Sequence, residues 1–135
     1  MANGSSAGSS TGSNTEQGGL QPCPASPNCV SSQADPADAK HYLPPVAVSG
    51  EPLVISSVAA ALSELPRTTI VEQTDTYLHA EVRSRVFGFV DDVEFVYDLS
   101  AKVLHFRSAS RLGYSDMGVN RKRMESLSAR LRDAL

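Results

Sequence analysis

Three segments of the chain, residues 77–85, 91–98 and 103–111, alternate apolar and polar residues with a period of two. In the middle segment, for example, Phe95 lies on one face and Glu94 on the other. Side chains of a strand point alternately to its two faces. The pattern therefore predicts an antiparallel sheet with one buried face and one polar, wetter face.

The flanking segments predict an α+β fold around that sheet. Residues 68–73 are rich in β-branched residues and predict a short fourth strand. Apolar residues at helical spacing predict a helix that begins near residues 49–52 and ends before Pro66, and a second helix from Val119 or Asn120 to the C-terminus. We expect the order helix, about four antiparallel strands, helix, with both helices on the apolar face of the sheet.

Residues 1–22 are dominated by Ser, Gly, Asn, Thr and Gln and predict a disordered tether. The remainder, 23–135, is long enough for one domain, which starts with an extended arm over residues 23–50 that is rich in Cys and Pro. The tether is typical of a linker left after a signal or lipid anchor is removed. We therefore expect an extracytoplasmic protein, either periplasmic or anchored to a membrane through a missing N-terminal segment.

Two cysteines, Cys23 and Cys29, enclose the five residues Pro-Ala-Ser-Pro-Asn. This spacing is neither the Cys-x-x-Cys of a redox motif nor half of a four-ligand zinc site. We favour a disulfide that fixes the start of the domain, over a metal clip or a redox pair, since the tether indicates export.

The formal net charge of the chain is −3. Nucleic-acid binding depends on a broad cationic surface, so the overall charge argues against a nucleic-acid partner. Residues 107–123 nevertheless hold five basic residues and one acidic residue. Three of the five, Arg121, Lys122 and Arg123, fall in the first turns of the expected helix and oppose its dipole.

Cations packed this densely need counter-ions, and two sources are open. The preferred source is the acidic run 91–94, which would give a structural network of salt bridges. The alternative source is an external small anion, gripped by arginines and by the free amides at the start of the helix. The candidate ligand-binding residues are Arg83, Arg85, Arg107, Arg111, Tyr114, Arg121, Arg123, Asp91, Asp92 and Glu94.

The polar face of the sheet admits other interpretations. It could be a solvated ladder of ion pairs, which is the preferred interpretation, or a ligand-binding platform. A metal site built on His79, His105, Glu81 and Glu94 has suitable ligand types but no tight spacing, and nearby arginines oppose a cation. Acid–base catalysis by the acidic residues is disfavoured, because adjacent arginines lower carboxyl pKa values. We therefore predict no catalytic residue, no metal and no cofactor.

An apolar turn around Gly88 contains Val86, Phe87, Phe89 and Val90. We expect these side chains to close one end of the core. Exposed, they would instead form an apolar patch suited to a partner or a membrane surface.

Three blocks of sequence carry a family resemblance: residues 23–32 (CPASPNCVSS), 84–95 (SRVFGFVDDVEF) and 107–123. In this order they resemble the bacterial and plastid family known as domain of unknown function 1499, over residues 23–133. Members of that family are often exported, lipid-anchored or fused to a membrane segment, which fits the tether. The resemblance implies no activity and no catalytic residues.

The residues and the resemblance together favour a non-enzymatic, extracytoplasmic binding or accessory domain. Its partner would be a small anionic ligand, at the arginine-rich site, or another protein. The alternative is an enzyme or metalloprotein that uses a face formed by Asp91, Asp92, Glu94, His79 and His105.

Overall fold

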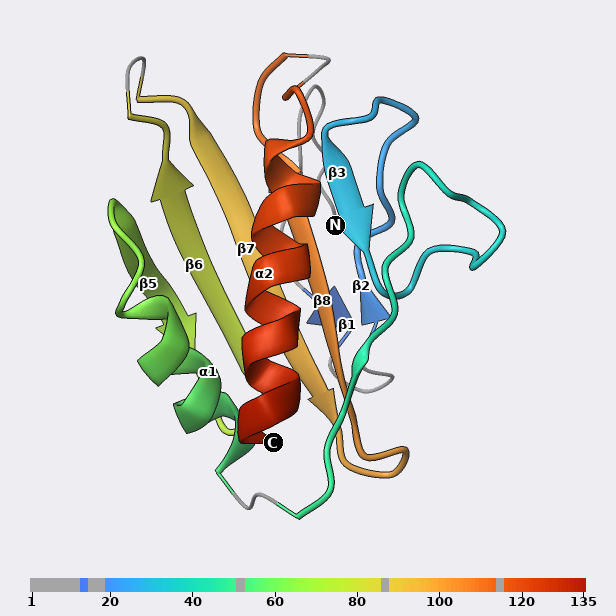
Figure 1. Ribbon diagram of the computed structural model, residues 1–135, viewed down its shortest axis with the longest axis vertical. Coiled ribbons are helices and arrows are strands. Elements are labelled where there is room, and N and C mark those ends of the chain that lie inside the picture. Colours follow the sequence, from blue (N-terminus) through green and yellow to red (C-terminus); the bar gives the residue numbers. More distant parts are fainter. Residues whose placement is uncertain (1–12, 15–18, 51–52, 86–87, 114–115) are drawn as a thin grey trace.

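The computed structural model describes residues 13–14, 19–50, 53–85, 88–113 and 116–135. These residues form a six-stranded antiparallel sheet, a separate two-stranded pairing and two helices (Figure 1). Both helices lie on the same side of the six-stranded sheet. The predicted α+β class is confirmed.

The large sheet has the strand order β3-β8-β7-β6-β5, with β4 also paired to β8. Four of its strands are the predicted ones, and β3 and β4 are additional. Both are too short to show an alternating pattern, and they lie one after the other along the outer edge of β8. The strands are β3 (Cys29–Ser31), β4 (Val46–Ala47), β5 (Thr68–Gln73), β6 (Tyr77–Arg83), β7 (Val90–Asp98) and β8 (Val103–Ser110).

Helices α1 (Val54–Leu62) and α2 (Val119–Ala134) cover the apolar face of the sheet. Phe95 of β7 and Phe106 of β8 pair across the strands with ring centroids 6.4 Å apart. Burial of these apolar side chains is the main stabilising term of such a two-layer fold. The core also contains Val30, Val46, Val54, Ile55, Val58, Leu62, Leu78, Ala80, Val82, Val93, Leu104, Met124, Leu127 and Leu131.

Part of the predicted tether lies within the described residues. Strands β1 (Ser13–Asn14) and β2 (Gly19–Leu20) pair antiparallel with each other. They lie on the side of the large sheet away from the helices (Figure 1). Residues 1–12 and 15–18 of the predicted tether lie outside the described part of the chain.

The predicted disulfide is confirmed: Cys23 and Cys29 are bonded, with their Cα atoms 5.7 Å apart. It joins the segment after β2 to the start of β3, which pairs with β8. Within the described part of the chain, neither helix is long and apolar enough to cross a membrane.

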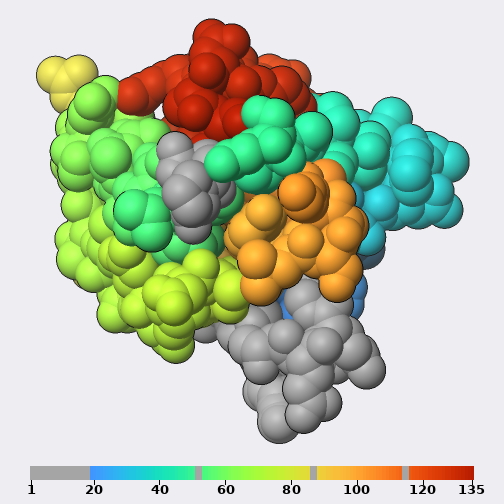
Figure 2. All heavy atoms as spheres, turned by 90° about the horizontal axis from the view of Figure 1, so that it is seen from below, coloured from blue at the N-terminus to red at the C-terminus, as the bar shows by residue number. Residues whose placement is uncertain are grey.

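The turn between β7 and β8 forms one end of the molecule, seen from below in Figure 2. The segment that contains β4 lies against this turn, where the backbone N–H of Val48 donates to the carbonyl of Lys102 at 3.0 Å. The connections from β6 to β7 and from β8 to α2 lie at the opposite end, at the top of Figure 1.

We predict that removing the disulfide by Cys23→Ala with Cys29→Ala lowers the free energy of unfolding by about 2 kcal/mol, because the unfolded chain loses a closed loop. Urea unfolding of the oxidised protein and of this double variant measures the difference. Reduced wild-type protein should match the variant, and reductant should not affect the variant. Equal stability of the oxidised protein and the variant would contradict the prediction.

Candidate functional site

Strand β7 distributes its three acidic residues over both faces of the sheet. Asp92 and Glu94 lie on the face away from the helices, opposite Glu81 and His79 of β6 in register. Asp91 lies on the face that the helices cover, where α2 contacts it. The face of the alternative hypothesis, which grouped Asp91 with Asp92 and Glu94, therefore does not include Asp91, because consecutive residues of a strand point to opposite faces.

Arg111 holds together a group of charged side chains that we call the Arg111 cluster: Arg111, Asp92, Glu81 and His79. Its Nε donates to Asp92 Oδ2 at 2.7 Å, and its Nη2 donates to Asp92 Oδ1 at 2.9 Å. Nη2 also donates to Glu81 Oε2 at 2.6 Å. His79 Nε2 lies 2.7 Å from Asp92 Oδ1. The bidentate contact of Arg111 with both carboxylate oxygens of Asp92 is the strongest geometry available to an arginine and a carboxylate.

A second ion pair on the same face joins Arg107 to Glu94, side chains that are only 1% and 0% exposed. Arg107 Nη1 lies 3.8 Å from Glu94 Oε1, and Tyr77 donates its hydroxyl to Glu94 Oε2 at 2.5 Å. Arg107 Nη2 donates to the carbonyl of Pro22 at 3.3 Å. Within the described residues, Nε and Nη1 of Arg107 have no hydrogen-bond acceptor.

This face of the sheet is buried at its centre, where a wetter face was expected. Residues 19–23, which we call the cover, cross it: β2 contacts β7, and Pro22 accepts from Arg107. The backbone N–H of Leu20 also donates to Gln33 Oε1 at 2.8 Å. The alternation in the sequence identifies the polar face correctly but carries no information about a cover supplied from elsewhere in the chain.

Burial and charge shift pKa values in this region in opposite directions. Burial alone would raise the pKa of Asp92, but hydrogen bonds from His79 and Arg111 outweigh it and hold that pKa well below its usual range. Burial alone would lower the pKa of His79, but the hydrogen bond and charge of Asp92, with the charges of Glu94 and Glu81, raise it. The hydrogen bond to Asp92 raises the pKa of Arg111. These shifts favour an ionised Asp92, a cationic Arg111 and a protonated His79.

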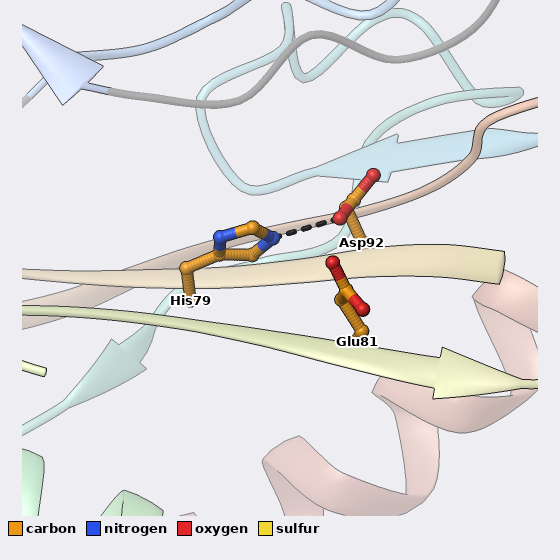
Figure 3. Close-up of side chains that lie close together, drawn as sticks. All are labelled: His79, Glu81 and Asp92. Atoms are coloured by element: carbon orange, nitrogen blue, oxygen red, sulfur yellow. Dashed lines mark hydrogen bonds and ion pairs between the residues drawn. The ribbon is translucent and has the colours of Figure 1, made fainter. Parts of the chain in front are cut away.

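A metal ion could in principle use part of this cluster, because ligand atoms of His79, Glu81 and Asp92 lie within 4.8 Å of one another (Figure 3). This set has Asp92 in place of the predicted Glu94 and His105. The guanidinium of Arg111 already contacts both carboxylates of the set. A cation would have to compete with it.

His105 lies farther along the same face, opposite Val96. Its Nδ1 is 2.9 Å from the hydroxyl of Ser32. Burial lowers the pKa of His105, which favours the neutral imidazole. His105 therefore lies apart from the Arg111 cluster, and its environment favours the neutral form.

His41 stands in the arm that follows β3, beside a cavity of about 350 Å³ next to the disulfide. Its Nδ1 lies 2.7 Å from Asp38 Oδ2, and its Nε2 lies 2.9 Å from the carbonyl of Ser26, inside the disulfide loop. The hydrogen bond with His41 lowers the pKa of Asp38. His41 thus fastens the disulfide loop to the arm, and the carboxylates of Asp35 and Asp38 at this cavity do not suit an anion.

A separate polar group lies between the sheet and the start of α2, and we call it the helix-face cluster: Asp91, Ser108, Ser110, Asn120 and Arg123. Arg123 donates to Asp91 Oδ2 and to Asn120 Oδ1, both at 2.9 Å. Ser108 donates its hydroxyl to Asn120 Oδ1 at 2.5 Å, and Asn120 Nδ2 donates to Ser110 Oγ at 3.0 Å. Arg123, a cation in an unfavourable place at a helix start, is thus neutralised by Asp91.

The other candidate arginines have different surroundings. Arg121 Nη2 donates to three carbonyls of the arm, those of residues 39, 40 and 42, at 2.8–3.1 Å. Arg83 is 57% exposed and lies 3.7 Å from Glu81. Arg85 is exposed and makes no hydrogen bond or ion pair within the described part of the chain. Tyr114 lies outside the described residues.

Sequence reasoning missed Asn120, Asp116 and Tyr77 as members of these networks. Asp116, two residues before the N-cap Gly118, accepts from the backbone N–H groups of Gly118 and Asn120 and so satisfies one of the free N–H groups at the start of α2. It also accepts from Asn120 Nδ2 at 2.7 Å. A signal was available for Asn120, because a polar residue at a core-facing position of a helix needs buried partners.

We predict that Asp92→Asn lowers the free energy of unfolding by about 3 kcal/mol, because it removes the partner of a buried, hydrogen-bonded charge network. Chemical denaturation measures this change. Glu72→Gln, on the exposed edge strand β5, is the matched control and should leave stability unchanged. Equal effects of the two substitutions would show that the Arg111 cluster contributes nothing specific.

We also predict that stability falls as the pH rises through the raised pKa of His79. The folded state holds the His79 proton more tightly than the unfolded state, so the contribution is complete below the ordinary value of 6.5 and is lost above it. The lowered pKa of Asp92 gives a second loss, as the pH falls below the ordinary value of 3.8. Denaturant unfolding across pH measures both.

The control for this pH dependence is a pair of histidine substitutions. His79→Gln should abolish the loss of stability above pH 6.5. His105→Gln should remove a slope of the opposite sign, because the pKa of His105 is lowered. An unchanged alkaline slope in His79→Gln would refute the assignment.

Comparison with protein-family models gives a match. The family model described as "Protein of unknown function (DUF1499)" matches residues 19–131, which include the cover, the sheet, the arginines and most of α2. No curated protein and no solved structure matches the chain. The match extends over most of the chain, and the protein therefore belongs to the DUF1499 family of proteins of unknown function.

Proposed function

We propose that the chain is a non-enzymatic, extracytoplasmic binding or accessory domain. The observation that carries this proposal is the pairing of its acids: Asp92 with Arg111, Glu94 with Arg107 and Asp91 with Arg123. General acid–base catalysis needs a group whose pKa lies near the working pH. Carboxylates fixed as ion pairs serve a structural scaffold better than a proton transfer.

The disulfide between Cys23 and Cys29 supports the extracytoplasmic part of the proposal. Disulfides persist in oxidising compartments and are rare in the reducing cytosol. More specifically, the proposal places the domain in the periplasm or anchors it to a membrane through a segment that precedes it. It agrees with the export and lipid anchoring that the family resemblance implied.

The ligand of such a domain would be a small anion, and three of the candidate arginines are accessible to it. Arg83 is 57% exposed and Arg111 is 41% exposed. Arg85 is exposed in the same part of the molecule, two residues beyond the end of β6. Guanidinium groups bind carboxylates and phosphates through paired N–H donors. Arg107, Arg121 and Arg123 are committed to internal partners.

A metalloprotein is the second candidate function, because His79, Glu81 and Asp92 present ligand atoms within 4.8 Å of one another. Carboxylate oxygens and an imidazole nitrogen suit zinc or manganese. The competing guanidinium of Arg111 is the physical argument against it.

A thermal-shift screen with inorganic phosphate, citrate, zinc and manganese tests both candidates. We expect the anions to raise Tm, and we expect Arg83→Gln with Arg85→Gln to remove the shift while Lys102→Gln, at the other end of the molecule, retains it. These side chains are exposed, so the variants should fold. A shift with metals that His79→Gln removes would replace the proposal with the metalloprotein. No response to either class would exclude these small ligands and leave a macromolecular partner.

A further inference from the structure

The disulfide joins two segments of the chain that the rest of the fold holds unequally. Cys29 belongs to β3, which pairs with β8. The carbonyl of Asn28, inside the disulfide loop, accepts from the backbone N–H of Ser110 at 3.0 Å. His41 Nε2 lies 2.9 Å from another carbonyl of the loop. The loop and Cys29 are therefore attached to the domain independently of the sulfur–sulfur bond.

The cover, on the other side of this bond, has weaker attachments. None of residues 19–23 is fully buried, and none is part of the hydrophobic core. Its hydrogen bonds to other described residues are those of Leu20 to Gln33 at 2.8 Å and of the Pro22 carbonyl to Arg107 at 3.3 Å. Strand β2 pairs with β1 in a separate sheet, so that pairing does not attach the cover to the large sheet. The disulfide is therefore a main attachment of the cover.

The cover keeps a charged side chain away from water. Arg107 is 1% exposed, and its Nε and Nη1 have no hydrogen-bond acceptor among the described residues. A buried donor without an acceptor loses the hydrogen bonds that water would supply. Hydration of Arg107 therefore favours an open cover. The disulfide opposes opening, because it holds Pro22, the residue before Cys23, over the guanidinium.

The two sulfur atoms differ in their access to a reductant. Cys23 is half-buried and lines the cavity of about 350 Å³ between the cover and the arm, whereas Cys29 is 0% exposed. Thiol–disulfide exchange needs access of a thiolate to one sulfur, so attack is expected at Cys23. Asp35 and Asp38 line the same cavity and disfavour an anionic thiol such as glutathione.

We propose that the disulfide is a redox switch: in the oxidised protein it holds the cover closed, and its reduction opens the polar face around Arg107 to solvent while the sheet and helices stay folded. This inference goes beyond the proposed function and does not depend on its small anion. The alternative is a purely structural disulfide, whose reduction lowers stability but leaves the folded conformation unchanged.

The reductant of this switch would be a protein dithiol. Its first thiolate attacks Sγ of Cys23, the bond between Cys23 and Cys29 breaks, and the electron pair leaves on Sγ of Cys29, which takes up a proton. The second thiolate of the reductant then breaks the mixed disulfide. Cys23 leaves as a thiol, and the reductant is oxidised to its own disulfide.

A fluorescent reporter on the cover tests the opening. The chain contains no tryptophan, so Leu20→Trp introduces a single one, at a half-buried position. We expect dithiothreitol, a neutral dithiol, to shift its emission to the red and to increase quenching by acrylamide, because the opened cover enters water. With Cys23→Ala and Cys29→Ala added, the emission should be red-shifted with or without dithiothreitol. Unchanged emission on reduction would refute the proposal.

Two further reporters serve as controls. Tyr97 is half-buried against the core, away from the disulfide, so Tyr97→Trp should not respond to dithiothreitol. Phe89 is 56% exposed, so the expectation that its side chain closes the core is wrong, and Phe89→Trp provides the emission of an exposed tryptophan as a reference. Equal red shifts of Leu20→Trp and Tyr97→Trp would indicate a general loosening of the domain and would overturn the switch.

Hydrogen exchange of the unsubstituted chain gives an independent measurement. After a few seconds of labelling, exchange reports local opening rather than global unfolding. We expect reduction to raise deuterium uptake in peptides over residues 19–23 and to leave uptake in β7 and α2 unchanged. No rise in residues 19–23, or an equal rise in all three segments, would support the purely structural disulfide instead.

A trapping experiment tests the route of reduction. A dithiol oxidoreductase whose second cysteine is replaced by serine cannot complete the exchange and stays bound as the mixed disulfide. We expect fragmentation of the joined peptides to place this bond on Cys23. A bond to Cys29, or no trapped complex, would overturn reduction by a protein dithiol at the accessible sulfur.

Discussion

The structure depends on neutralising three acids in the middle strand of its sheet. Asp91, Asp92 and Glu94 lie within four consecutive positions of β7, which has neighbours on both sides and a covered surface on both faces. A buried charge that loses its partner costs several kcal/mol, so each acid requires a cation at a fixed place. Because side chains alternate along a strand, Asp91 points to α2 and pairs with Arg123. Asp92 and Glu94 point to the other face, where they pair with Arg111 and Arg107. The basic residues within 107–123 therefore serve chiefly as counter-ions of this short acidic run.

The sequence allowed the architecture to be predicted wherever a long segment repeats one period. Strands β6, β7 and β8 and both helices were predicted because their buried and exposed residues alternate over several turns or pleats. Strand β5 was predicted from its β-branched residues. Strands β3 and β4 were not, because a two- or three-residue strand such as Val46–Ala47 has no period and forms only because β8 offers an unpaired edge. The sequence predicted that basic residues pair with Asp92 and Glu94, but it did not predict which arginine pairs with which acid. Their choice depends on the register of β8 against β7, which charge alone does not determine.

The burial of the polar face has a different origin and could not be predicted from any local pattern. Glu94 is fully buried because the cover lies over it, and the cover belongs to a stretch whose composition predicted a tether. The contact between Pro22 and Arg107 makes residues 19–23 part of the packed domain, and the family match likewise begins at residue 19. The disulfide and His41 then fix the chain immediately after the cover. The N-terminal boundary of the domain is therefore set by a buried guanidinium rather than by hydrophobic sequence.

The same neutralisation determines how much of the arginine charge reaches the surface of the molecule. Arg107, Arg121 and Arg123 satisfy acids and carbonyls of the interior or the arm, so their charge contributes little to the outside. Arg85 and Lys122, which are exposed, and the outer side of Arg111 stand at the ends of elements, where β6 and β8 leave the sheet and α2 begins. Apolar residues are exposed at the same place because the chain must cross between layers there and the core no longer covers them. The acids of β7 thus pair with Arg107, Arg111 and Arg123. Arg85 and Lys122 remain exposed at the end of β6 and at the start of α2.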